Sequence, residues 1–171
     1  KSVISKSLKL YLRQYKPKAH WHLQPAGQVA DTFQSLTKII RCTPGSFFYS
    51  MAGSTREDSG YMQAWADIER KASDFLNQFI QTGPYSELTV VARLLKALPK
   101  RSNLHLANSM AVRYANILGL SPDKEVSVYA NRGTSGIDGS TSTAVGCALS
   151  SRQLTTLITG DMAFFYDRNG L

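Results

Sequence analysis

Between residue 103 and the end of the chain, short apolar segments alternate three times with segments of helical character. Strands are predicted at 103–107, 125–130 and 154–159, and helices at 109–118, at 140–149 and from near Phe164 onward. Strands joined through helices run parallel, because each helix returns the chain to the starting edge of the sheet. The sequence therefore predicts the α/β class, with a doubly wound parallel sheet that carries helices on both faces.

The part of the chain before residue 100 predicts a smaller α/β unit followed by a linker. A helix is predicted at 5–16 and short strands at 20–23 and 37–41, the second of them ended by Pro44 and Gly45. Residues 52–60 are small, polar and typical of turns, whereas apolar residues recur at helical spacing over 61–80, and Ser86 with Glu87 opens a further helix. We expect the end of a small α/β domain at 1–52, a linker at 53–60 and the start of the parallel-sheet domain at 61–171.

The chain is basic, with 20 Lys and Arg residues against 12 Asp and Glu residues and a net charge of +8. No helix-turn-helix, zinc-binding or RNA-binding signature accompanies these charges, so a solvated helix face or anionic small molecules explain them better than nucleic acid. No apolar run is long enough to span a bilayer, and no signal-peptide pattern opens the chain.

The cysteines and the two ends of the sequence indicate the cellular compartment and whether the chain is complete. Cys42 and Cys147 lie too far apart for a metal-binding motif, and Cys147 is expected to be a buried free thiol, which fits a reducing cytoplasm. The chain begins at Lys1 rather than at Met and stops at Leu171, inside a predicted helix start. We therefore expect a fragment, truncated on both sides, of a cytoplasmic protein.

Polar residues follow each strand of the predicted parallel sheet. Asn108 and Ser109 follow the first strand, and Arg113 lies one helical turn beyond Ser109. Both Ser109 and Arg113 can therefore face the same ligand carboxylate, for which the planar guanidinium fork is well suited. The alternative is that Asn108 and Ser109 only cap the following helix.

The second strand is followed by a glycine-rich segment, NRGTSGIDG, over 131–139. Its glycines permit backbone shapes that other residues resist and allow close approach of a cofactor. Arg132 is the candidate carboxylate binder. The alternatives are a tight turn for the segment and a surface salt bridge for Arg132; the pattern is neither a P-loop nor the usual dinucleotide fingerprint.

The third strand ends in Gly160-Asp161, which places a carboxylate at the sheet edge. Mg²⁺ binds through one or two carboxylates together with phosphate oxygens, so Asp161 is a candidate metal ligand. The alternative is a helix cap. Because ligands of open α/β sheets bind at the carboxyl ends of the strands, all three polar segments are expected to converge on one edge.

The three motifs LANSMAVR, NRGTSGIDGSTSTAVG and ITGDMAFFYDRNGL together closely resemble the family of 2-succinyl-5-enolpyruvyl-6-hydroxy-3-cyclohexene-1-carboxylate synthases. The resemblance is close over 103–171 and loose over 1–102, where only SKSLK and the general layout agree. It implies that the chain holds the end of the family's central domain and the start of its diphosphate-binding domain. The alternatives are another thiamine-diphosphate enzyme, of the decarboxylase or acetolactate synthase type, and a non-catalytic binding module.

The resemblance implies a carboligase of menaquinone biosynthesis that uses thiamine diphosphate with Mg²⁺ or Mn²⁺. Such enzymes decarboxylate 2-oxoglutarate, add the resulting succinyl semialdehyde unit to isochorismate, and assemble as homodimers or homotetramers. The family's second metal ligand, an asparagine, and the glutamate that activates the cofactor fall outside this chain. The 171 residues alone are therefore expected to be inactive.

The resemblance also assigns roles to individual residues. Asp161 matches the family's first metal ligand, and Ile137 matches the apolar residue that supports the bent cofactor. Cofactor-binding roles are implied for Asn131, Gly133, Gly136, Ile137, Gly160 and Asp161, and substrate-binding roles for Ser109, Arg113, Arg132 and Lys6. Lys6 matches a lysine that contacts isochorismate, but Ser7 stands where the family often has Arg, so the resemblance does not imply that second anion contact here.

Overall fold

The computed structural model describes residues 5–54, 60–133 and 135–171, which form two compact units, Lys1–Gln63 and Ala64–Leu171. Each unit is described by itself. Most of the predicted linker, residues 55–59, lies outside the described residues.

The first unit contains two helices and a pair of parallel strands. Its elements are α1 (Lys6–Gln14), β1 (Trp21–Leu23), β2 (Lys38–Ile40) and α2 (Pro44–Met51), and β1 pairs with β2 in parallel. The predictions of α1, β1 and β2 are confirmed. Helix α2 was not predicted, because Pro44 was interpreted only as the end of a strand. Proline also suits the first turn of a helix, and here the Thr43 hydroxyl accepts a hydrogen bond from the Ser46 N–H at 3.2 Å.

Two predicted helices precede the larger sheet, α3 (Tyr61–Thr82) and α4 (Glu87–Ala97). Ser86 begins α4 with a capping box, in which the Ser86 hydroxyl accepts the Thr89 N–H and the Thr89 hydroxyl accepts the Ser86 N–H. Val91 and Leu95 on α4 are buried, and they anchor this helix to the core of the second unit.

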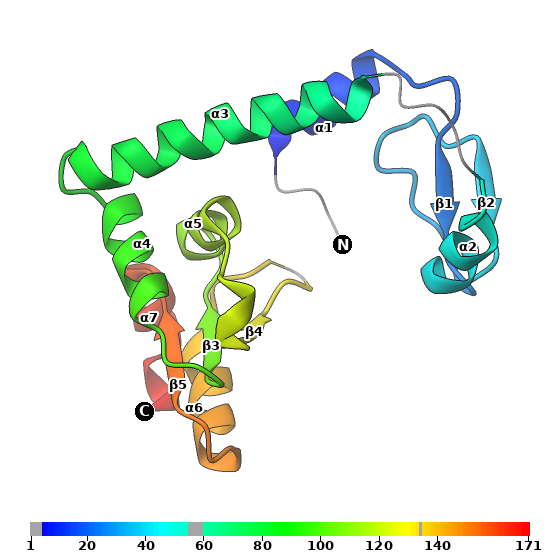
Figure 1. Ribbon diagram of the computed structural model, residues 1–171. Coiled ribbons are helices and arrows are strands. Elements are labelled where there is room, and N and C mark those ends of the chain that lie inside the picture. Colours follow the sequence, from blue (N-terminus) through cyan, green and yellow to red (C-terminus); the bar gives the residue numbers. More distant parts are fainter. Residues whose placement is uncertain (1–4, 55–59, 134) are drawn as a thin grey trace. The chain divides into compact units, whose positions relative to one another are not determined.

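Strand β3 (Asn103–Leu106) lies between β4 (Ser127–Ala130) and β5 (Thr155–Ile158), and all three strands are parallel (Figure 1). Every residue of β3 is buried, and Leu104 is 0% exposed. A strand buried on both faces is typical of a parallel sheet that helices cover from both sides.

Helices lie against both faces of this sheet, which confirms the predicted α/β class. The chain passes from β3 to β4 through α5 (Met110–Leu118), and from β4 back past β3 to β5 through α6 (Ser140–Ser150). Leu104 and Leu106 form the apolar core with α4 and α5. On the opposite face, the Asn103 amide donates to the Ser151 hydroxyl at the end of α6, at 3.2 Å.

Two details of the second unit differ from expectation. Helix α7 (Asp161–Tyr166) begins at Asp161 rather than near Phe164, since an acidic side chain is favourable in the first turn of a helix. Cys147 is half-buried rather than buried, because it faces Thr155 on the edge strand β5, with 3.9 Å between the Thr155 hydroxyl and the cysteine sulfur.

Short 3₁₀ turns complete the second unit, one at Pro122–Lys124 and one at Arg168–Gly170. Within the described parts of the chain, no helix combines the length and the apolar character that crossing a bilayer requires.

The fully buried Leu104 gives a direct test of this core. Leu104→Ala removes apolar contacts and leaves a cavity, which should lower the free energy of unfolding by about 2–5 kcal/mol. Leu149→Ala is the matched control, because Leu149 is 85% exposed on α6 and its loss should change stability little. Urea titration followed by circular dichroism measures both; equal effects of the two variants would contradict the described core.

Candidate active-site cleft

The three strands of the larger sheet end at the same edge. Leu106 pairs with Ala130 of β4 and with Ile158 of β5, so the segments that follow all leave the sheet together. Those segments begin at Ala107, Asn131 and Thr159. The predicted convergence of the three polar segments is therefore confirmed.

A cleft of about 480 Å³ opens at this edge, between α4, α5 and the end of β5. Of the predicted site residues, it brings together Ser109, Gly160 and Asp161. One wall of the cleft is apolar and includes Val90, Leu94 and Met110 from the two helices. A mixed lining of this kind suits a ligand with an apolar ring and a polar or charged end.

Ser109 sits at the turn from β3 into α5 with a strained backbone. Its φ of 70° and ψ of −130° fall in a region that L-residues rarely adopt, at a cost of about 1–3 kcal/mol. Its side chain makes no capping hydrogen bond to α5. The cap interpretation of Ser109 is therefore wrong, and the side chain remains exposed at the cleft.

Asp161 and Gly160, which follow β5, form another part of the cleft rim. Asp161 is exposed, and its Oδ1 accepts the Met162 N–H at 2.7 Å, so the carboxylate also supports the first turn of α7. A Cβ at Gly160 would meet no atom within 4 Å, so packing within the chain does not require glycine there. A hard oxygen donor beside open space fits a metal-bridged diphosphate.

The glycine-rich loop lies against the end of β3. Arg132 Nη1 donates to Asn108 Oδ1 at 2.7 Å, and the Asn131 amide donates to the Gly139 carbonyl and the Thr143 hydroxyl, both at 3.0 Å. Among the described residues, no carboxylate lies within ion-pair distance of Arg132. The salt-bridge interpretation of Arg132 therefore has no support in this part of the chain.

The remaining predicted residues do not line the cleft. Ile137 is half-buried and packs against the apolar core, and a Cβ at Gly133 would meet nothing within 4 Å. The other residues, Arg113 on α5, Gly136 in the loop and Lys6 at the start of α1 in the first unit, are exposed. Their predicted roles in binding stay predictions.

The sequence analysis missed several residues that line the cleft, among them Tyr85, Glu87 and Tyr114. The Tyr114 hydroxyl donates to Glu87 Oε2 at 3.0 Å, and this hydrogen bond raises the pKa of Tyr114 above its ordinary value of 10.0. No local signal could reveal this pair, because it joins two helices that only the tertiary fold brings together.

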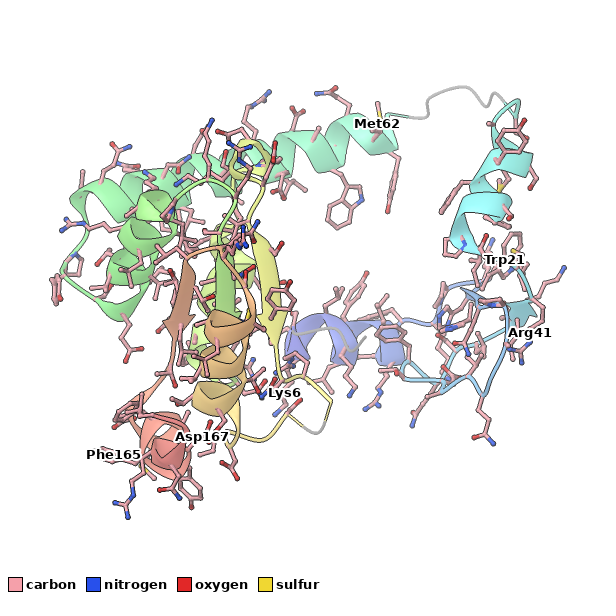
Figure 2. The ribbon with its side chains drawn as sticks, turned by 90° about the horizontal axis from the view of Figure 1, so that it is seen from below. Lys6, Trp21, Arg41, Met62, Phe165 and Asp167 are labelled. Atoms are coloured by element: carbon pink, nitrogen blue, oxygen red, sulfur yellow. The ribbon has the colours of Figure 1, made fainter. Side chains whose placement is uncertain are left out.

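Asp167 fastens the segment that carries Asp161 to α6. Asp167, labelled in Figure 2, is 8% exposed. Its carboxylate accepts the Ser142 N–H at 2.7 Å and the Ser142 hydroxyl at 2.5 Å. These hydrogen bonds hold the pKa of Asp167 below its ordinary value of 3.8. Gly170 packs so closely that an added Cβ would lie 2.7 Å from the Ser142 nitrogen.

One titratable group lies inside the sheet. His105 is 5% exposed and stacks on Tyr129, with 5.0 Å between the ring centroids. Burial lowers the pKa of His105, which favours the neutral form of the ring. Among the described residues, no group of three or more His, Cys, Asp or Glu side chains is arranged to hold a metal ion.

The chain is similar along nearly its whole length to a set of bacterial synthases. The 2-succinyl-5-enolpyruvyl-6-hydroxy-3-cyclohexene-1-carboxylate synthase of Bacteroides fragilis is 45% identical over 171 residues, which cover 99% of this chain and 29% of that protein. The synthases of the same name from Flavobacterium psychrophilum and Cytophaga hutchinsonii are 40% and 41% identical, over 99% and 98% of this chain and 30% of theirs. No family model matches the chain. The chain thus spans about 30% of the length of these curated relatives.

The lowered pKa of Asp167 predicts how this segment responds to acid. Because the folded state favours the carboxylate, its stabilisation is fully present above the ordinary pKa of 3.8 and is lost as the pH falls through the lowered value. Asp167→Asn should therefore lower the free energy of unfolding near neutral pH, and the difference from the wild type should shrink towards about pH 2. Asp123→Asn is the control, since that side chain is 65% exposed. A wild-type advantage that stays constant down to about pH 2 would refute this role.

Proposed function

Because the chain belongs by sequence to the family of 2-succinyl-5-enolpyruvyl-6-hydroxy-3-cyclohexene-1-carboxylate synthases, we propose that it is part of a thiamine-diphosphate-dependent carboligase. The parent enzyme decarboxylates 2-oxoglutarate and transfers the succinyl semialdehyde unit to isochorismate in menaquinone biosynthesis. The observation that carries this proposal is the convergence, at one sheet edge, of the segments bearing Ser109, Arg132 and Gly160-Asp161.

In this proposal the cleft rim at Gly160-Asp161 holds the diphosphate end of the cofactor. Asp161 supplies one carboxylate ligand to Mg²⁺, with Mn²⁺ as a substitute, and Gly160 leaves room for phosphate oxygens. Asn131, Gly133, Gly136 and Ile137 belong to the loop that faces the rest of the cofactor. Bound thiamine diphosphate supplies the electron sink for decarboxylation, which no side chain of the protein can provide.

The substrates are both carboxylates, and the site residues carry matching groups. Arg132 has no carboxylate partner among the described residues, so its charge remains available to an anionic substrate. In this proposal Ser109, just before α5, and Arg113, one turn along that helix, bind the same substrate. Lys6, in the first unit, is proposed to contact isochorismate.

We further propose that the 171 residues by themselves do not catalyse the reaction. The chain spans about 30% of its curated relatives, and Asp161 is its one proposed metal ligand. The remaining metal ligand and the group that activates the cofactor come from other parts of the parent enzyme, which acts in the cytoplasm as a homodimer or homotetramer. Consumption of isochorismate by the purified 171-residue chain would refute this part of the proposal.

The metal-binding role of Asp161 is tested in the full-length enzyme. Asp161→Ala should abolish Mg²⁺-dependent binding of thiamine diphosphate, because the diphosphate then loses its bridging ion. Isothermal titration calorimetry with and without Mg²⁺ measures this binding, and Asp123→Ala serves as an exposed control. If the Asp161 variant still bound thiamine diphosphate with unchanged dependence on Mg²⁺, Asp161 would only support the first turn of α7.

The substrate-binding role of Arg132 and Arg113 is tested by steady-state kinetics. Replacing either with Ala should raise the KM for a carboxylate substrate roughly 10- to 100-fold, the loss expected for hydrogen bonds to a charged group. Arg152→Ala is the matched control, because Arg152 is exposed and lies between α6 and the start of β5, at the edge of the sheet opposite the strand ends. A loss of stability without any change in KM would contradict the binding role.

A further inference from the structure

Asn108 is a buried polar side chain at the junction of the two loops that carry Ser109 and Arg132. It is 3% exposed, and its amide nitrogen donates to the Asn131 carbonyl at 2.7 Å and to the Gly136 carbonyl at 2.5 Å. Its amide oxygen accepts the Arg132 guanidinium N–H at 2.7 Å. Both the amide nitrogen and the amide oxygen of Asn108 therefore bond residues of the glycine-rich loop.

The contacts of Asn108 do not serve the helix that follows it. The sequence analysis left open that Asn108 caps α5, but its side chain instead reaches residues 23 and 28 positions away in the chain. The cap interpretation is therefore wrong for Asn108 as well as for Ser109. The result of these bonds is a cross-link between the strained turn at Ser109 and both ends of the 131–136 segment.

A neutral amide is the only common side chain of this size that satisfies all three partners. The two carbonyl groups require donors, whereas the guanidinium requires an acceptor, and an Asn side chain offers both. An Asp at this position would repel the two carbonyl oxygens. It would also neutralise Arg132 with a buried ion pair. Asn108 fixes the direction of the Arg132 side chain while leaving its positive charge uncompensated.

We infer that Asn108 is a positioning residue, which aims Arg132 with its full charge at the carboxylate of an anionic substrate. This inference rests on the proposed function, which assigns Arg132 to substrate binding. Asn108 itself does not act on reacting atoms. Its effect on the reaction passes through the orientation of Arg132 and through the cross-link to the turn that holds Ser109.

The test uses two substitutions of Asn108 and a matched control in the full-length enzyme. Asn108→Asp keeps the shape of the side chain but replaces the donating amide nitrogen with a carboxylate oxygen. The new negative charge then competes with a substrate carboxylate for Arg132. Asn108→Ala removes every hydrogen bond of the side chain. Asn103→Asp is the control, because Asn103, at the start of β3, is as buried as Asn108 but donates to Ser151 and Thr155, away from the loop. KM and kcat for both carboxylate substrates are measured, together with hydrogen exchange over residues 131–139.

Asn108→Asp should raise the KM for at least one carboxylate substrate by about tenfold, the order of one hydrogen bond to a charged group, with kcat changed less than KM. Both Asn108 variants should accelerate exchange over residues 131–139, and the Asn103 variant should not. An unchanged KM and unchanged exchange in Asn108→Asp would overturn the inference. If the wild-type enzyme performs no carboligation, the proposed function fails. The cross-link made by Asn108 is tested independently of that result, because unaltered hydrogen exchange over residues 131–139 in both Asn108 variants would overturn it.

If Asn108→Ala fails to fold, the conservative Asn108→Asp variant and its exchange pattern decide the question. A purely structural role would lower stability and leave the ratio of KM to kcat unaffected. An Asn103 variant that reproduced the KM increase would likewise overturn the inference, because a general loosening of the sheet would then explain the kinetics.

Discussion

The arrangement of the site depends on the burial of strand β3 between two parallel neighbours. All four of its residues are buried, and its register with β4 and β5 brings the ends of the three strands to one edge. Apolar side chains at alternate positions bind α4 and α5 on one face, while Asn103 meets the end of α6 on the other. A shift of β3 by one residue would exchange these faces and separate the loops that form the cleft.

Charges at the sheet edge are distributed rather than paired. Glu87 and Asp161 line the cleft, whereas Arg132 is held by the neutral side chain of Asn108. The Asp167 carboxylate accepts hydrogen bonds from the N–H and the hydroxyl of Ser142, which fixes the segment that follows the proposed metal ligand. In both cases a neutral hydrogen-bonding group sets the position of a charged one; the exposed Arg132 keeps its charge available for a ligand, whereas the buried Asp167 holds the segment in place.

The sequence predicted the regular elements because their periodicity is local. Strands β3, β4 and β5 and the helices between them follow from apolar spacing and turn residues, and α2 was missed because Pro44 has two meanings, strand end and helix start. The motif residues were found from their positions after strands. The hydrogen bonds around these residues were not predicted, because Asn108 bonds residues 23 and 28 positions away in the chain, and Tyr114 on one helix bonds Glu87 on another. Such pairings depend on tertiary structure, which no local pattern encodes.

The most direct test of the account is a carboligation assay of the full-length enzyme with 2-oxoglutarate and isochorismate. We expect 2-succinyl-5-enolpyruvyl-6-hydroxy-3-cyclohexene-1-carboxylate to form only when thiamine diphosphate and Mg²⁺ are both present. Mass spectrometry of the product, with each component omitted in turn, makes the measurement. Absence of product from the complete mixture, or product that forms equally well without cofactor or metal, would contradict the account.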